Sequence, residues 1–245
     1  MSSNPLITSK AFEQNSKELL NDKTFTIQWT ISKIQISLIV ILLAGCYTWN
    51  MLANGFSDKA HMLTLASAIA GFILALFTAF KPANAKLTTI PYAICEGLFL
   101  GSISFAYQAF FNGIVVKAVG LTFLALFSML FLYKSGMIKA TDKFKKVIII
   151  STISIAVFYL IALLGTFLGF RFTLFDGGII GIGVSFAICA VAALNFIIDF
   201  DFIEKAKENE LPSDFEWYGA FTLLVTLIWL YIEVLRLLSL LSNRD

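Results

Sequence analysis

The sequence Asn195-Phe-Ile-Ile-Asp199-Phe-Asp201-Phe-Ile-Glu204 places three carboxylates at the end of one long apolar segment and shortly before another. The second apolar segment carries Glu233 and Arg236 among leucines and other apolar residues. Ionisable side chains at bilayer depth cost kilocalories each, so they usually face the interior of a helix bundle or a water-filled cavity. The two segments therefore define the fold, and their charged residues are the first candidates for function.

Composition indicates an integral membrane protein. Of the 245 residues, 58% are hydrophobic and only 14% are charged, and the mean hydropathy is +0.84. About 20 apolar residues span the hydrocarbon layer of a bilayer as a helix. The net charge of +2 does not point to nucleic acid as a partner, because the basic residues lie in segments that flank the membrane. We expect an all-α polytopic fold with seven transmembrane helices, over residues 31–53, 62–80, 88–110, 113–133, 147–170, 177–203 and 217–241.

The cysteine and histidine content argues against several kinds of site. Cys46, Cys95 and Cys189 lie singly inside apolar segments, so neither a disulfide framework nor a zinc site is indicated. His61 is the only histidine, which excludes multi-histidine metal sites and argues against Ser-His-Asp catalysis. We therefore expect no resident cofactor and no enzymatic activity.

The polar residues 1–30 are expected to form a cytosolic tail, and residues 31–245 the seven-helix membrane domain. The tail mixes Ser, Asn and Gln with charged residues, and it lacks the basic start, short apolar region and small-residue cleavage site of a signal peptide. A weak helical pattern would also let the tail lie on the membrane surface, although we favour a solvated tail.

The positions of the lysines and arginines predict how the chain is oriented. Loops on the cytosolic side of membrane proteins carry an excess of these residues. With the N-terminus inside, thirteen of them fall on the inner side and four on the outer side, and Arg236 lies within a helix. The sequence thus predicts a cytosolic N-terminus and, with seven spans, an external C-terminus. The inner set is Lys10, Lys17, Lys23, Lys33, Lys81, Lys86, Lys134, Lys139, Lys143, Lys145, Lys146, Lys205 and Lys207, and the outer set is Lys59, Lys117, Arg171 and Arg244.

Two of the expected helices begin with capping signals. Thr88 could cap the helix over 88–110, where Pro91 fits the first turn. Ser213-Asp-Phe-Glu216 matches a capping box at the start of the last helix. The aromatic residues Trp217 and Tyr218 would then lie at the membrane interface.

Pairs of glycines indicate where helices pack closely. Gly97 and Gly101 form a GxxxG pattern, and small residues at this spacing let helix backbones approach each other in lipid. The neighbouring Glu96 would then be pressed toward another helix, either as part of an ion path or as a purely structural hydrogen-bonding group. Gly177 and Gly181 repeat the spacing, so we expect both helices to belong to the crowded centre.

Helical geometry separates the roles of the acidic residues at 195–204. Asn195 and Asp199 are four residues apart and share a face, whereas Asp201 lies about 200° round the helix from Asp199. Asp199 is therefore the candidate for the interior. Asp201 fits an interior position and a solvated face equally well, and Glu204 fits a solvated face with weak ion pairs.

The depth of Glu233 follows from the length of the last helix. It lies about 24 Å beyond Trp217 along the helix axis, which places it past the bilayer midplane. Asp199 and Glu96 lie nearer the cytosolic side, so spacing alone leaves contact between Asp199 and Glu233 open. Arg236, three residues after Glu233, could be its counter-ion.

Three stretches of sequence resemble the Bax inhibitor-1 family, the transmembrane Bax inhibitor motif proteins, and specifically its bacterial branch. The resemblance spans roughly residues 31 to 241. It implies a bundle in which the other helices surround the seventh, located in the bacterial inner membrane. The stretches are Tyr92-Ala-x-x-Glu96-Gly97-x-x-x-Gly101-x-x-Ser104, Asn195-Phe-Ile-Ile-Asp199-Phe-Asp201-Phe-Ile-Glu204, and Glu216-Trp-Tyr-Gly-Ala-Phe with Trp229-Leu-Tyr-Ile-Glu233-Val-Leu-Arg236-Leu-Leu.

The resemblance also implies a pH-sensitive calcium leak controlled by two hydrogen-bonded carboxylates on the sixth and seventh helices. Asp199 resembles the family's aspartate on the sixth helix, and Glu233 is the carboxylate in the body of the seventh. This chain departs from the family pattern because Phe200-Asp201 replaces Thr-Gln. Matching the Leu-Arg-Leu ending of the family also places its second aspartate near Thr226, two turns before Glu233.

We therefore expect a pH-gated cation leak in which Asp199 and Glu233 share a proton near neutral pH. Loss of this proton at higher pH would separate their helices. Because hard cations take oxygen ligands, we expect Glu96, Asp199, Asp201 and Glu233 to line the path, with Arg236 beside them. Asp199 and Glu233 would bind calcium transiently.

Two other functions compete with the leak. The chain could be a regulator that binds other membrane proteins, such as the membrane-anchored AAA protease that bacterial relatives suggest, with residues 1–30 as the contact. Its carboxylates would then be structural. An intramembrane aspartyl protease is the weakest alternative, because the chain has no Gly-x-Gly-Asp element.

Overall fold

The computed structural model describes residues 24–167, 169 and 178–242, and its long elements are all helices. Each of seven helices is long and apolar enough to cross a membrane, which confirms the seven predicted spans. A short 3-10 turn, η1 (Pro82–Asn84), lies between the second and third of them. The seven are α2 (Ile27–Ala53), α3 (Ser57–Phe80), α4 (Ala85–Phe110), α5 (Ile114–Lys134), α6 (Asp142–Phe167), α7 (Ile179–Glu208) and α8 (Phe215–Ser242).

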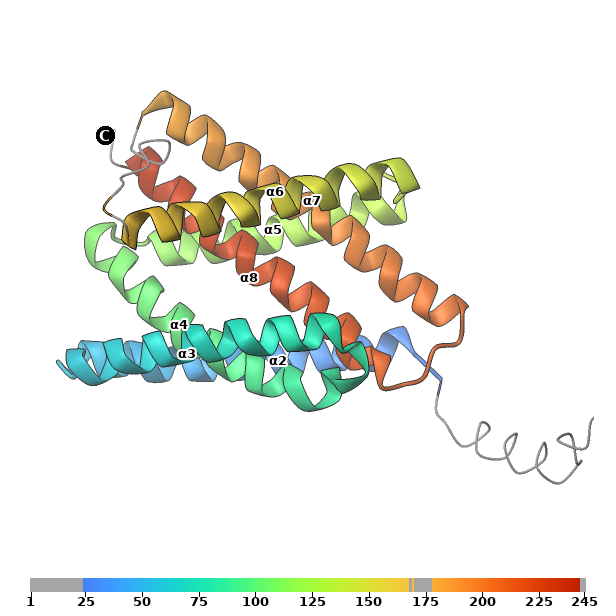
Figure 1. The fold of residues 1–245 in the computed structure, drawn as a ribbon, viewed down its shortest axis with the longest axis horizontal. Helices are drawn as coiled ribbons and strands as arrows, with labels where there is room; N and C mark the ends of the chain where they lie inside the picture. Colours follow the sequence, from blue (N-terminus) through green and yellow to red (C-terminus); the bar gives the residue numbers. More distant parts are fainter. Residues whose placement is uncertain (1–23, 168, 170–177, 243–245) are drawn as a thin grey trace, which may run out of the picture.

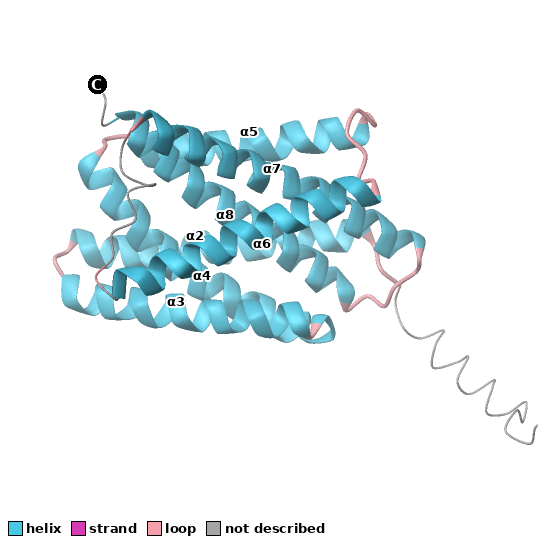
Figure 2. Ribbon diagram, turned by 45° about the horizontal axis from the view of Figure 1, so that its top comes forward, coloured by secondary structure: helices cyan, strands magenta, loops and turns pink. Residues whose placement is uncertain are grey.

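Helix α8 lies at the centre of the bundle. In Figure 1, α2, α3 and α4 form one group, α5, α6 and α7 form another, and α8 runs obliquely between them. It packs against α7, α2, α5 and α4. In its apolar stretch of 18 residues, 61% are buried inside the bundle, whereas the corresponding value for α6 is 6%. In the turned view of Figure 2, helices again lie on both sides of α8, and α6 passes in front of the α2–α4 group. The central position expected for the seventh span is thereby confirmed.

Several helices extend further than the apolar runs predicted. Helix α6 begins at Asp142 and not at residue 147, and α7 continues to Glu208 and not to residue 203. Polar side chains support the extra turns, as in the ion pair at 3.0 Å between Lys205 Nζ and Asp201 Oδ2. Hydropathy marks only the part of a helix that lies in lipid, so it misses turns that project beyond the bilayer.

The predicted start of the third span at Thr88 is wrong. Helix α4 begins at Ala85, directly after η1, so Thr88 lies inside the helix and Pro91 is in its second turn. The Thr88 hydroxyl donates to the Asn84 carbonyl at 3.2 Å and accepts a hydrogen bond from Thr78 of α3 at 2.6 Å. Thr88 therefore ties α3 to α4 through buried hydroxyls and does not cap a helix.

The capping box predicted at Ser213 is also not formed, because Glu216 has other partners. Its carboxylate accepts hydrogen bonds from the Thr26 N–H at 2.8 Å and from the Thr26 hydroxyl at 3.0 Å, and it pairs with Lys33. Only 3% of Glu216 is exposed. We call Thr26, Lys33 and Glu216 the α2–α8 clamp, since they join the N-cap and second turn of α2 to the first turn of α8.

The glycines of α4 lie against α2. A Cβ on Gly97 would come within 2.7 Å of Ala44 Cβ, and one on Gly101 would overlap the Gly45 carbonyl and the Thr48 hydroxyl. The two backbones therefore touch along this face. On α7, Gly181 is buried, while Gly177 lies outside the described residues.

The helices run alternately up and down, so the lysines gather at one end of the described bundle. Figure 1 shows the α3–α4, α5–α6 and α7–α8 connections at this end, which we call the lysine-rich side. It carries Lys81, Lys86, Lys134, Lys139, Lys143, Lys145, Lys146, Lys205 and Lys207.

This asymmetry predicts the topology in the membrane. A reporter placed at the N-terminus or in the α5–α6 loop should read the cytosol, and one after Ser242 should read the outside, because lysine-rich loops stay inside. Accessibility of single cysteines to an impermeant thiol reagent in intact cells measures this. A C-terminus on the cytosolic side would mean that one of the seven helices enters and leaves the membrane on the same side.

Candidate functional site

A buried carboxylate lies where α7 meets the central helix. The Thr226 hydroxyl of α8 donates to Asp199 Oδ2 of α7 at 2.7 Å, and both side chains are buried. Asp199 is 8% exposed. None of the ion pairs among the described residues involves Asp199. Its partners on the facing helix are thus neutral hydroxyls, since Thr222, one turn before Thr226, also interacts with the carboxylate.

The surroundings of Asp199 are apolar. Phe196 and Phe200 precede and follow it on α7, with their rings stacked at 6.1 Å, and Leu223 of α8 is also buried. A charged carboxylate without a cationic partner is costly in such surroundings, and protonation removes that cost. The arrangement at Asp199 can therefore respond to proton binding.

A second polar cluster lies further along α8, around Glu233, which is 3% exposed. Glu233 Oε1 accepts hydrogen bonds from the Tyr159 hydroxyl of α6 and, at 3.3 Å, from the Trp229 indole N–H. Arg236 Nη1 lies 3.6 Å from Glu233 Oε2 and donates to the Tyr159 hydroxyl at 2.7 Å. Here a guanidinium and two donors compensate the carboxylate, and the cluster joins α6 to α8.

The structure does not bring Asp199 and Glu233 together as a hydrogen-bonded pair. Thr226, the residue that faces Asp199, is seven residues before Glu233, which corresponds to about 10.5 Å along the helix axis. Asp199 therefore meets the position where the resemblance placed the second aspartate, and this chain has threonine there. The expected calcium site of two carboxylates is likewise not assembled, and the described residues contain no cluster of three metal-ligating side chains.

Glu96 faces a different neighbour. Its Oε1 lies 3.1 Å from where a Cβ on Gly71 of α3 would stand, and it interacts with Tyr92 one turn earlier on α4. The Tyr92 ring in turn packs edge-on against Phe221 of α8 at 5.1 Å. Glu96 thus belongs to the α3–α4 contact and is not brought to Asp199 or Glu233.

Asp201 and Asn195 attach the exposed helix α6 to α7. Asp201 pairs with Lys145, and the Asn195 amide donates to the Thr152 hydroxyl at 2.9 Å. Lys145, Thr152 and Tyr159 follow one another at intervals of seven residues along α6, so they share one face of that helix.

Sequence reasoning missed these α6 partners. Lys145, Thr152 and Tyr159 each carry a polar group at a heptad interval, among other polar residues of this helix such as Ser151 and Ser154. That spacing was the available signal, and it indicates a polar seam toward the bundle. Thr222 and Thr226 carried a weaker signal: they lie four residues apart and share a face of α8, and the family's second aspartate is expected near Thr226.

Comparison with known proteins yields one match. The family model described as Bax inhibitor 1 like matches residues 4–243, essentially the whole chain. No curated protein and no solved structure matches the sequence. The matched range includes α6, α7 and α8, which carry the polar groups around Asp199 and around Glu233.

Proposed function

The chain belongs to the Bax inhibitor 1-like family, and we propose that it is a proton-regulated cation leak across the membrane that it spans. The observation that supports the proposal is Asp199, a buried carboxylate between α7 and α8 whose partners on α8 are the hydroxyls of Thr226 and Thr222. No cation compensates it within the described residues. Gain or loss of a proton at Asp199 would therefore disturb the α7–α8 interface more than the same change at a carboxylate that is paired with a cation.

In this mechanism protonated Asp199 is neutral and the α7–α8 interface is closed. At higher pH the proton leaves, and the charged carboxylate draws water and a cation toward the interface. Hard cations such as calcium accept carboxylate and hydroxyl oxygens as ligands, and Asp199 and Thr226 offer one of each. The leak would thus open as pH rises.

The cluster at Glu233 has a different role in this proposal. Tyr159 and Trp229 donate to Oε1, and the Arg236 guanidinium lies 3.6 Å from Oε2 and compensates the charge, so a passing cation would have to compete with a resident one. We assign Glu233 to holding α6 against the central helix. The gate is then one carboxylate with a threonine, in place of the two carboxylates expected from the sequence.

A flux assay tests the proposal. The purified chain is placed in liposomes that contain a calcium dye, and calcium entry is followed from mildly acidic to mildly alkaline pH. Entry that rises with pH is the expected result. A folded protein that passes no calcium over this range would overturn the leak, and the alternative of a membrane regulator, with a membrane-anchored protease among its partners, would take its place.

Thr226→Val is expected to shift the midpoint of this pH dependence upward by about one pH unit. A hydrogen bond to a charged group contributes about 1.5 kcal/mol, and about 1.4 kcal/mol corresponds to one unit. The variant loses one of the two donors that stabilise charged Asp199 and keeps Thr222, so a higher pH is needed to remove the proton. Thr166→Val, at the exposed end of α6, is the matched control and should keep the wild-type midpoint. An unchanged midpoint in Thr226→Val would exclude the Asp199–Thr226 contact from gating.

A further inference from the structure

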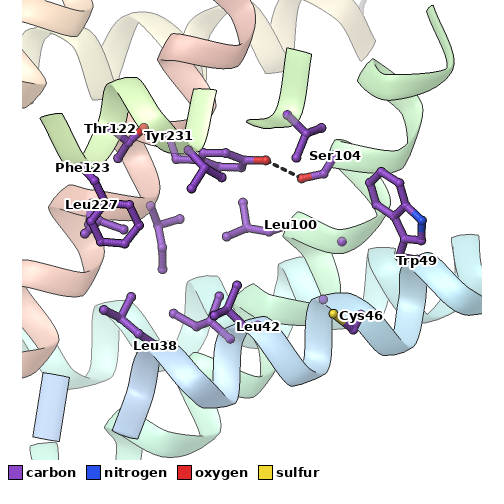
Figure 3. A pocket seen from close by; sticks show the side chains of 16 residues that line it. Leu38, Leu42, Cys46, Trp49, Leu100, Ser104, Thr122, Phe123, Leu227 and Tyr231 are labelled. Carbon is purple, nitrogen blue, oxygen red and sulfur yellow. Dashed lines mark hydrogen bonds between the residues drawn. The ribbon is translucent and has the colours of Figure 1, made fainter. Parts of the chain in front are cut away.

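A pocket of about 270 Å³ lies between α2, α4, α5 and α8 (Figure 3). Its wall consists mainly of apolar side chains. The hydroxyls in the wall are already engaged, since Ser104 and Tyr231 share a hydrogen bond at 2.7 Å and Thr122 donates to the Ala118 carbonyl. Together with the Cys46 thiol and the Trp49 indole, the wall therefore offers an occupant mainly apolar contact. Leu38, Leu42, Leu100, Val119, Phe123 and Leu227 illustrate the lining.

The pocket opens toward the lipid-facing surface. Leu42 of α2 is 66% exposed and Val119 of α5 is 38% exposed, and Cys46 beside Leu42 is also exposed. On the opposite wall, Leu100 and Ile228 are buried. An apolar chain could thus enter between α2 and α5 and reach the centre of the bundle without crossing a polar barrier.

A second pocket, of about 720 Å³, continues the first toward the lysine-rich side. Three helices, α2, α5 and α8, line both pockets, so the two lie end to end, and together we call them the α2–α5 groove. On each of these helices, residues of the two pockets lie one turn apart: Leu38 and Ile34 on α2, Phe123 and Leu126 on α5, and Leu227 and Leu223 on α8.

The lysine-rich end of the groove carries uncompensated positive charge. Lys134 and Lys139 line it, both are exposed, and neither takes part in an ion pair of the described residues. Two carboxylates also line this end: Asp201 pairs with Lys145 and Lys205, and Glu204 accepts a hydrogen bond from the neutral Tyr133 hydroxyl. Four lysines thus face two carboxylates, which leaves an excess of positive charge. This end of the groove therefore favours an anion.

We propose that the α2–α5 groove binds an anionic phospholipid of the surrounding bilayer. Its headgroup lies by Lys134 and Lys139, and one acyl chain runs into the pocket between α2 and α5. The groove has a cationic end and an apolar end, and such a lipid has an anionic headgroup and apolar acyl chains, so each part of the lipid meets a matching part of the groove. Basic residues next to a membrane helix attract anionic headgroups. The proposal does not depend on cation flux.

Photolabelling tests the apolar part of the site. The full chain is placed in bilayers that contain phosphatidylglycerol with a diazirine on one acyl chain, and labelled peptides are mapped by mass spectrometry. Labelling of 38–46 and 115–123 should exceed that of the lipid-facing helix α3, which serves as an internal reference. Val119→Trp fills the groove and should lower this labelling several-fold, with Leu42→Trp as a second variant from the opposite wall.

The matched control is Val116→Trp. Val116 lies on the same helix, is 77% exposed and does not line the pocket, so the substitution should leave groove labelling unchanged. Groove labelling equal to wild type in Val119→Trp and Leu42→Trp, with melting temperatures unchanged, would overturn the proposal.

Competition tests the headgroup. Unlabelled phosphatidylglycerol should displace the probe several-fold better than phosphatidylcholine with the same chains, and Lys134→Gln with Lys139→Gln should remove this preference. Lys117→Gln, at the other end of α5, should keep it. Equal competition by the two lipids in the wild type would overturn the assignment of an anionic lipid.

Discussion

Gly101→Leu is expected to lower the melting temperature of the purified protein sharply, or to prevent its folding. The new Cβ would overlap the Gly45 carbonyl and the Thr48 hydroxyl, and a carbonyl of the backbone cannot turn away as a flexible side chain can. Overpacking of a fitted interface costs about 1–3 kcal/mol or more. Thermal unfolding in detergent measures the effect.

Gly120→Leu provides the control for this change. Gly120 is exposed on α5, and a Cβ there would meet nothing within 4 Å. The same residue exchange should therefore leave the melting temperature unchanged or raise it slightly, since glycine is a poor helix former. If Gly101→Leu melted like Gly120→Leu, the backbones of α2 and α4 would not touch at Gly101.

Glu216→Ala is expected to destabilise the protein by about 3–5 kcal/mol, because removing one partner of a buried ion pair leaves the other charge uncompensated. In the α2–α8 clamp, the change leaves Lys33 without its carboxylate and Thr26 without its acceptor. The start of α2 should then separate from the start of α8. A lower melting temperature and faster proteolysis near residue 26 would report the loss.

The control uses an exposed ion pair on the same turn of chain. Asp214 pairs with Lys86 at 3.3 Å, and both side chains are more than half exposed, so Asp214→Ala should cost no more than about 1 kcal/mol. The combined change Glu216→Leu with Lys33→Met should recover much of the loss, because no charge then stays buried. Equal effects of Glu216→Ala and Asp214→Ala would show that the clamp contributes no more than a surface pair.

The seven helices could be predicted because each apolar run is long enough to span a bilayer by itself. The partner of Asp199 could not, since spacing along one helix gives a face and a depth but not the register against the next helix. That register depends on how α7 and α8 cross and on the connection at 209–214. It places Thr226 opposite Asp199 and leaves Glu233 two turns away.

Glu216 shows a second limit of sequence reasoning. The spacing Ser213-Asp-Phe-Glu216 satisfies a local capping pattern, yet the carboxylate binds Thr26 and Lys33, which lie more than 180 residues earlier in the chain. The ion pair with Lys33 and the two hydrogen bonds from Thr26 stabilise the carboxylate more than one hydrogen bond from the Ser213 N–H would. Local patterns cannot reveal such a competitor, because it is brought near only by the packing of α2 on α8.

The central claim is that the proton on Asp199 regulates the leak, and the pH profile of calcium flux in Asp199→Asn tests it most directly. Asparagine keeps the shape of the side chain and can still accept the Thr226 hydroxyl, but it cannot ionise. We expect flux that stays low from mildly acidic to mildly alkaline pH, while wild type and the exposed-site control Glu208→Gln rise with pH. A wild-type pH profile in folded Asp199→Asn would contradict the account.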